Sequence, residues 1–83
     1  MQHNLNVVGK NIAKLRQRRR WTREELAAKL QLLGCNITLG VLIRIESGRC
    51  IVTDAQIVFF SEVFDIPVEQ LYPPKSQFRN GAT

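Results

Sequence analysis

A short pattern that marks the start of a helix occurs three times in this chain. The pattern is an apolar residue, a hydroxyl residue that can accept a backbone hydrogen bond, an acidic or amide residue three positions later, and a second apolar residue directly after that. It is complete at residues 21–26 (WTREEL) and 52–57 (VTDAQI), and residues 37–42 (ITLGVL) lack only the acidic or amide partner. Thr22, Thr38 and Thr53 therefore predict three helix starts without any reference to periodicity.

Glycines and apolar spacing extend this pattern to about five short helices. Gly34 and Gly48 follow the second and third predicted helices, and glycine readily adopts the left-handed conformation that ends a helix. Pro67 is placed to open a short last helix through Leu71. Apolar residues recur at spacings of three and four in the first and fourth predicted helices: Val8, Ile12, Leu15, Ile57, Phe60 and Phe64. No alternating runs joined by a tight turn predict strands, so we expect a compact all-α bundle.

The length of the chain, 83 residues, suits one small domain. We expect that domain at residues 8–72, with an N-terminal arm at residues 1–7 and a C-terminal tail at residues 73–83. Its predicted core takes residues from each later helix: Leu26, Ala27, Leu30, Leu42, Ile45, Phe60, Phe64, Ile66 and Leu71.

Nothing in the sequence predicts catalysis, a metal site or a membrane span. The only histidine, His3, lies near the terminus, and Cys35 and Cys50 have no histidine close to them. The longest apolar run covers residues 57–60, whereas a bilayer needs roughly 18 residues. We therefore expect free thiols in a reducing, cytoplasmic setting, no cofactor or metal, no membrane, and a protein that is not an enzyme.

Basic residues are concentrated in the first fifty positions. Residues 1–50 contain ten basic and three acidic residues, a net charge of +7, whereas residues 51–83 contain two and four, a net charge of −2. This asymmetry favours a polyanionic partner, nucleic acid or an acidic membrane surface, that approaches from one side. A basic face that is merely solvated is the alternative.

Four segments, in this order, resemble the successive motifs of the Cro/C1-type (XRE-like) helix-turn-helix family. They are residues 12–16 (IAKLR), 21–27 (WTREELA), 45–48 (IESG) and 66–71 (IPVEQL), and the resemblance runs from about Val8 to Tyr72. It implies a lambda-repressor-like domain of five helices that binds duplex DNA, regulates transcription as a repressor and acts as a homodimer. The arginine that matches Arg16 commonly pairs in this family with the glutamate that matches Glu46, so we assign Arg16 to structure.

The resemblance also implies which residues contact DNA. Arg23 and Arg49 would face phosphates, and the third predicted helix would enter the groove. The run at residues 18–20 would add phosphate contacts, although cations at the end of the first helix can instead stabilise that helix. The full expected set is Arg18, Arg19, Arg20, Thr22, Arg23, Thr38, Leu39, Gly40, Val41, Ile43, Arg44 and Arg49.

Two departures from the family pattern leave alternatives open. The stretch between Ala27 and Glu46 is about four or five residues longer, which implies an extended second helix or an enlarged turn. The positions expected in the groove are mostly apolar, and only Arg44 can donate hydrogen bonds to bases, so base discrimination should be low. The same apolar residues could instead bind a protein, or the longer turn could cover them as core.

We place the dimer contact on the fourth predicted helix. Phe59 lies about 100° round this helix from the inward-facing Phe60, so it is expected to be at least partly exposed. Phe59, with Tyr72 and Phe78, is the candidate anchor. The alternative is that Phe59 packs under Pro73-Pro74 within one chain.

Overall fold

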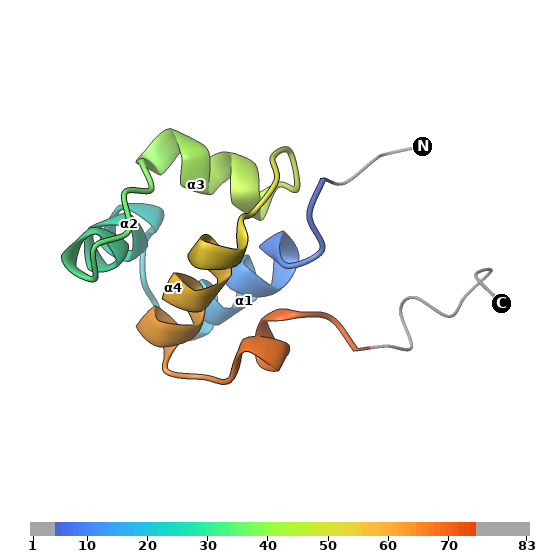
Figure 1. Cartoon of the computed structure of the whole chain (residues 1–83). Coiled ribbons are helices and arrows are strands. Elements are labelled where there is room, and N and C mark those ends of the chain that lie inside the picture. Colours follow the sequence, from blue (N-terminus) through green and yellow to red (C-terminus); the bar gives the residue numbers. More distant parts are fainter. Residues whose placement is uncertain (1–4, 75–83) are drawn as a thin grey trace, which may run out of the picture.

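The computed structural model describes residues 5–74 and shows four α-helices followed by one 3₁₀ turn (Figure 1). The elements are α1 (Gly9–Arg18), α2 (Arg23–Leu32), α3 (Leu39–Glu46), α4 (Asp54–Phe64) and η1 (Val68–Leu71). No strand occurs among these residues. The predicted all-α class is confirmed, and the expected fifth helix is the single turn η1.

Threonine caps start three of the helices, as the sequence predicts. Thr22 Oγ1 accepts the Glu25 backbone N–H at 3.0 Å, and the Glu25 carboxylate accepts the Thr22 N–H at 2.7 Å. Thr53 and Gln56 make the same reciprocal pair at 3.1 and 3.0 Å. Thr38 Oγ1 accepts the Val41 N–H at 3.2 Å without a returning side chain. Each cap satisfies a backbone donor that the first helical turn leaves unpaired.

Left-handed residues end three of the helices and bend the chain after α1. Gly34 and Gly48 have φ of 97° and 77° after α2 and α3, which confirms both predicted helix ends. Arg20, after α1, and Asp65, after α4, adopt φ of 59° and 55° without being glycine. A side chain disfavours this conformation. Because neither residue is glycine, the sequence does not indicate the left-handed conformation at these two positions.

The core fills the space between the four helices, and α3 lies against both α1 and α2. Its largest fully buried side chains come from every helix and include Phe60, Phe64, Leu26 and Leu42. Cys35 and Ile37, in the α2–α3 connection at residues 33–38, are also buried. Neither was in the predicted core. These two residues anchor the connection, so the extra length of this stretch forms an enlarged turn packed onto the core.

Cys35 and Cys50 are both free thiols, as predicted. Burial raises the pKa of the Cys35 thiol, because its thiolate would lose hydration in the core.

Ile66, predicted as core, is only partly buried. None of the helices in the described part of the chain has both the length and the apolar character needed to cross a membrane.

Asn6 joins the start of α1 to the end of α3. Its amide Nδ2 donates to the carbonyls of Ile45 and Cys50 at 3.1 and 2.9 Å, and its Oδ1 accepts the Gly9 N–H at 2.7 Å. A Cβ at Gly9 would lie 2.0 Å from the Ile45 carbonyl oxygen, so only glycine permits this approach. The end of the expected N-terminal arm is therefore bonded to the domain, through Asn6 and through the Leu5 N–H, which donates to the Gly48 carbonyl at 2.8 Å. Residues 1–4 and 75–83, including Phe78, lie outside the described residues.

Candidate nucleic-acid interface

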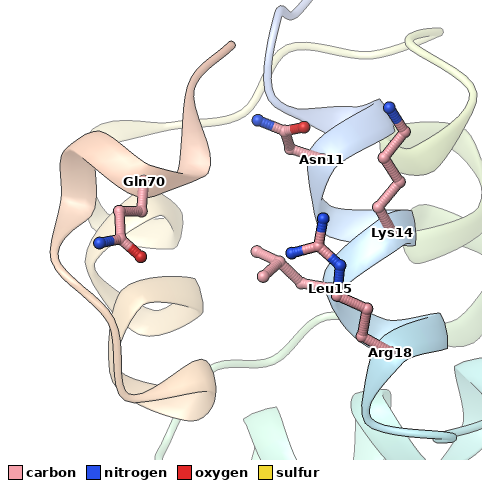
Figure 2. A pocket seen from close by; sticks show the side chains of 5 residues that line it. All are labelled: Asn11, Lys14, Leu15, Arg18 and Gln70. Carbon is pink, nitrogen blue, oxygen red and sulfur yellow. The ribbon is translucent and has the colours of Figure 1, made fainter. Parts of the chain in front are cut away.

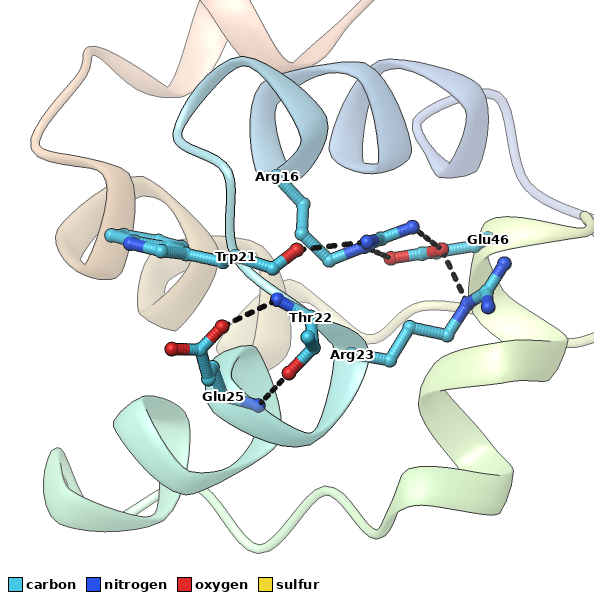
Figure 3. Close-up of polar contacts among 6 residues, drawn as sticks. All are labelled: Arg16, Trp21, Thr22, Arg23, Glu25 and Glu46. Carbon is cyan, nitrogen blue, oxygen red and sulfur yellow. Dashed lines mark hydrogen bonds and ion pairs between the residues drawn. The ribbon is translucent and has the colours of Figure 1, made fainter.

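A buried ion pair fixes α3 against α1. Arg16 Nε and Nη2 donate to the two carboxylate oxygens of Glu46 at 2.8 and 3.1 Å, and Arg16 Nη1 donates to the Trp21 carbonyl at 2.9 Å (Figure 3). The two side chains are 9% and 3% exposed. Two parallel charge-assisted hydrogen bonds define both the distance and the orientation of the partners. The pairing that the family resemblance implies for Arg16 and Glu46 is therefore present.

Arg23, at the start of α2, shares the same carboxylate. Its Nε donates to Glu46 Oε1 at 3.0 Å, while its side chain is 46% exposed. Its two terminal nitrogens make no hydrogen bond to residues 5–74, and Figure 3 shows them beyond the bond to Glu46, close to α3. Two guanidinium groups thus face one carboxylate, which leaves a net positive charge where the start of α2 meets α3.

The exposed face of α3 combines apolar residues with one arginine. Leu39 and Ile43 are 37% and 45% exposed, and Gly40 and Arg44 are also exposed. Val41, expected to face the groove, is instead partly buried and packs against the core, because it lies on the side of α3 that carries Leu42 and Ile45. The enlarged turn does not cover Leu39 or Ile43, so that alternative is wrong for these two residues.

Basic residues gather at the carboxyl-terminal end of this exposed face. Arg49 lies three positions after the last residue of α3, is exposed, and donates its backbone N–H to the Arg44 carbonyl at 2.8 Å. Arg23 lies beside Glu46 on the α2 side of the same helix. Glu46 is the only acidic residue of α3 and it is buried. No acidic side chain of α3 therefore opposes the charge of Arg23, Arg44 and Arg49.

Thr22 and Thr38 use their side-chain oxygens as helix caps. The Thr22 backbone N–H is also engaged, by Glu25. Each hydroxyl keeps its own proton, which remains free to be donated to an outside acceptor. Both threonines are exposed, so their expected contact with DNA is reduced to this one donor each.

Arg19 belongs to a different part of the molecule. Its guanidinium donates to the Phe64 carbonyl at the end of α4 and lies 5.4 Å from the centre of the Trp21 ring. Trp21 stacks on Phe64 with ring centres 5.6 Å apart, and Lys29 Nζ lies 4.7 Å from the Trp21 ring centre. Arg19 therefore closes the carboxyl end of α4 and covers an aromatic pair. This structural contact is one that nothing in the local sequence indicates, and the side chain is exposed, so its phosphate contact stays a prediction.

Arg18 lies on the side of α1 that faces η1 rather than α3. It lines an open hollow of about 250 Å³ together with Lys14, Leu15, Asn11 and Gln70 (Figure 2). The Asn11 amide donates to the Leu71 carbonyl at 3.2 Å and holds the two walls together. In Figure 1, α3 and η1 lie on opposite sides of α1. The structure thus brings Arg23, Arg44 and Arg49 to α3, and separates Arg18 and Arg19 from them.

Arg20 is exposed and lies in the turn between α1 and α2, in the left-handed conformation. The part of the chain that the structure describes holds no group of three or more His, Cys, Asp or Glu side chains placed to bind a metal.

The chain was also compared with known proteins. No family model, curated protein or solved structure matches it.

Proposed function

We propose that the chain is a DNA-binding transcriptional regulator of the Cro/C1 type, in which α2 and α3 act as a helix-turn-helix and α3 enters the major groove of duplex DNA. The observation that carries this proposal is the exposed face of α3, bordered by Arg23, Arg44 and Arg49 and free of acidic side chains of its own. A helix of this kind, flanked by cations, suits a polyanion with a groove wide enough to admit it.

Affinity would come mainly from phosphates. Arg23 and Arg49 are both exposed near the carboxyl-terminal end of α3, where the backbone at one edge of the groove would pass. Phosphate contacts of this kind fix the position of a protein on duplex DNA but carry no base sequence. The proposal therefore predicts measurable binding to DNA of arbitrary sequence.

A protein-interaction module on the same fold is the second candidate. Leu32 is 87% exposed and Leu33 37% exposed at the end of α2, next in the chain to the connection that leads to α3. Clusters of exposed apolar side chains mark partner sites on soluble proteins. In this second case, binding to duplex DNA would be absent or independent of α3.

The proposed regulator acts as a homodimer in the cytoplasm. One short helix with a single polar side chain for base contacts offers little specificity, and two copies would double the contact. A two-fold dimer would present its two α3 helices roughly 34 Å apart, one turn of the duplex, and would bind a palindromic site.

A salt titration of binding to a random-sequence duplex tests the DNA-binding proposal directly. The association constant should fall with a log–log slope of about −0.9 for each phosphate that the protein neutralises. Fluorescence anisotropy of a labelled duplex at several salt concentrations measures this slope. If no binding is detectable even at low salt, the DNA-binding proposal fails and the protein-interaction candidate takes its place.

A further inference from the structure

Leu39 and Ile43 form an apolar strip along the exposed face of α3. They are 37% and 45% exposed, and because they are four positions apart they lie about 40° apart around the helix. Gly40, about 100° round from Leu39, has no side chain, and a Cβ built there meets no atom within 4 Å. The strip is therefore partly open to solvent, and nothing at Gly40 keeps a partner away from the helix backbone.

The charges around the strip indicate what kind of surface it fits. Arg44 lies on α3 itself, Arg49 follows the helix and Arg23 adjoins it through Glu46. All three side chains are exposed. All three cations lie at the carboxyl-terminal end of the strip, so the surface suits a partner that shows apolar groups next to a row of negative charge. The major groove has this character only where its pyrimidines carry a C5-methyl group.

We propose that Leu39 and Ile43 recognise the C5-methyl groups of pyrimidines in the major groove, so that the preferred sites are rich in thymine or 5-methylcytosine. This inference rests on the proposed function, and it names the chemical group that α3 reads. Arg44, about 100° round from Ile43, supplies the hydrogen-bond donors and selects a guanine close to the methylated pyrimidine. Discrimination would then rest on the methyl group of a pyrimidine and on the O6 and N7 acceptors of guanine.

Replacing thymine with deoxyuridine removes only the methyl group, and leaves the base pair and the phosphates in place. A duplex selected by the full-length protein from a random pool would be synthesised with either base, and both forms titrated by fluorescence anisotropy. The Kd should rise about fourfold for each methyl group that the strip buries, the factor expected for loss of one buried methylene-sized group. Replacing cytosine with 5-methylcytosine at a position beside a contacted guanine should lower the Kd by a similar factor.

The residue assignment is tested with a Leu39→Ala/Ile43→Ala variant. Both positions are exposed on a helix, so the variant should keep the wild-type helical circular dichroism spectrum, and its Kd for the thymine and deoxyuridine forms should be nearly equal. Leu32→Ala is the matched control, because Leu32 is an exposed aliphatic residue on α2, outside α3. Leu32→Ala should keep the full ratio.

Three outcomes would overturn parts of this inference. Equal wild-type binding to the thymine and deoxyuridine duplexes refutes methyl recognition but leaves DNA binding intact. A ratio that survives in the double variant shows that other residues contact the methyl groups. The absence of binding to both duplexes at low salt overturns the proposed function itself.

Discussion

Arg16 and Glu46 form a bidentate ion pair inside the domain, with Nε–Oε2 at 2.8 Å and Nη2–Oε1 at 3.1 Å. The pair joins the last turn of α1 to the last residue of α3, and Asn6 links the start of α1 to the same end of α3 through the Ile45 carbonyl. The face that α3 presents to solvent is thus set by buried contacts. A partner of α3 would meet a surface already held in place.

Glu46→Gln should strongly destabilise the domain. The substitution leaves the Arg16 guanidinium buried without a counter-charge, a change that costs about 3–5 kcal/mol. Urea denaturation followed by circular dichroism measures the free energy of unfolding. The Arg16→Met/Glu46→Leu variant is the control, because replacing both charges with apolar groups removes the unpaired ion. This double variant should be closer to wild type in stability, and a double variant less stable than Glu46→Gln would contradict the argument.

Arg23→Ala should weaken binding to unrelated DNA sequences about equally and reduce the salt slope by roughly one. Its ion pair with the buried Glu46 should contribute only about 1 kcal/mol to stability, because the arginine is half exposed and Arg16 already neutralises the carboxylate. Salt titrations of the two proteins on several unrelated duplexes measure the effect. A loss confined to one sequence would mean that Arg23 contacts a base.

Arg19→Ala is the matched control for Arg23→Ala, since it removes the same charge from another face. It should lower stability by about 1–2 kcal/mol through loss of the hydrogen bond to Phe64 and of the contact with the Trp21 ring. Its salt slope should equal that of the wild type. A slope reduced as much as that of Arg23→Ala would keep Arg19 in the DNA-contacting set.

Local chemistry made the helices predictable, whereas contacts between distant segments did not. The caps at Thr22, Thr38 and Thr53 involve residues three positions apart, so a short window of sequence contains both partners. Arg19 pairs with Phe64, 45 positions away, and its neighbours Arg18 and Arg20 have the same local composition. A basic run therefore indicates positive charge. Only the packing of α1 against α4 and η1 decides which of its arginines is available to contact phosphates.

The same distinction applies to the candidate site. The exposure of Leu39 and Ile43 and the burial of Val41 could not be separated from sequence, because all three are apolar residues of one short helix. Which of the three side chains is exposed depends on how α3 is rotated about its axis when it packs against the core. Asn6 shows the reverse case: nothing near it in sequence predicts that its amide meets the Ile45 and Cys50 carbonyls across the fold.

Arg20→Gly should stabilise the domain by roughly 0.5–1 kcal/mol. Arg20 has φ of 59°, a conformation that costs an L-residue about 1–2 kcal/mol and glycine almost nothing, and the larger freedom of glycine in the unfolded chain offsets part of the gain. Thermal unfolding should show a rise of a few degrees. Gly34→Ala, at φ of 97° with open space around the new Cβ, should have the opposite effect. A stability loss in Arg20→Gly would indicate a contact of the arginine side chain that outweighs the strain.

Arg44→Ala should flatten the preference among DNA sequences while leaving affinity for random DNA nearly unchanged. Arg44 is the only residue on the exposed face of α3 with a charged hydrogen-bond donor, and a good bidentate contact with guanine is worth about 1–3 kcal/mol of discrimination. Selection from a random pool with each protein compares the motifs. If the variant returns the same sharp motif, Arg44 does not read bases.

Phe59, the expected dimer anchor, is partly exposed as predicted, and it also packs against the core. Phe59→Asp would disturb the fold as well as any assembly, so the test of the dimer uses another residue. Val58 on α4 is 58% exposed, and Val68 and Tyr72, on or next to η1, are 37% and 41% exposed. Because α4 and η1 contact each other, these apolar side chains join Phe59 in the candidate surface for a second copy.

Sedimentation at micromolar concentration should therefore show a wild-type dimer that Val58→Asp converts into a folded monomer. A buried carboxylate without a partner strongly disfavours an interface, whereas the same group at an exposed position of the monomer costs little. Leu32→Asp is the control, because Leu32 is 87% exposed at the end of α2, outside this surface, and this variant should remain dimeric. A wild type that stays monomeric would remove the dimer from the proposal. Dissociation by Leu32→Asp but not by Val58→Asp would move the interface to the α2–α3 side, where it would compete with DNA for α3.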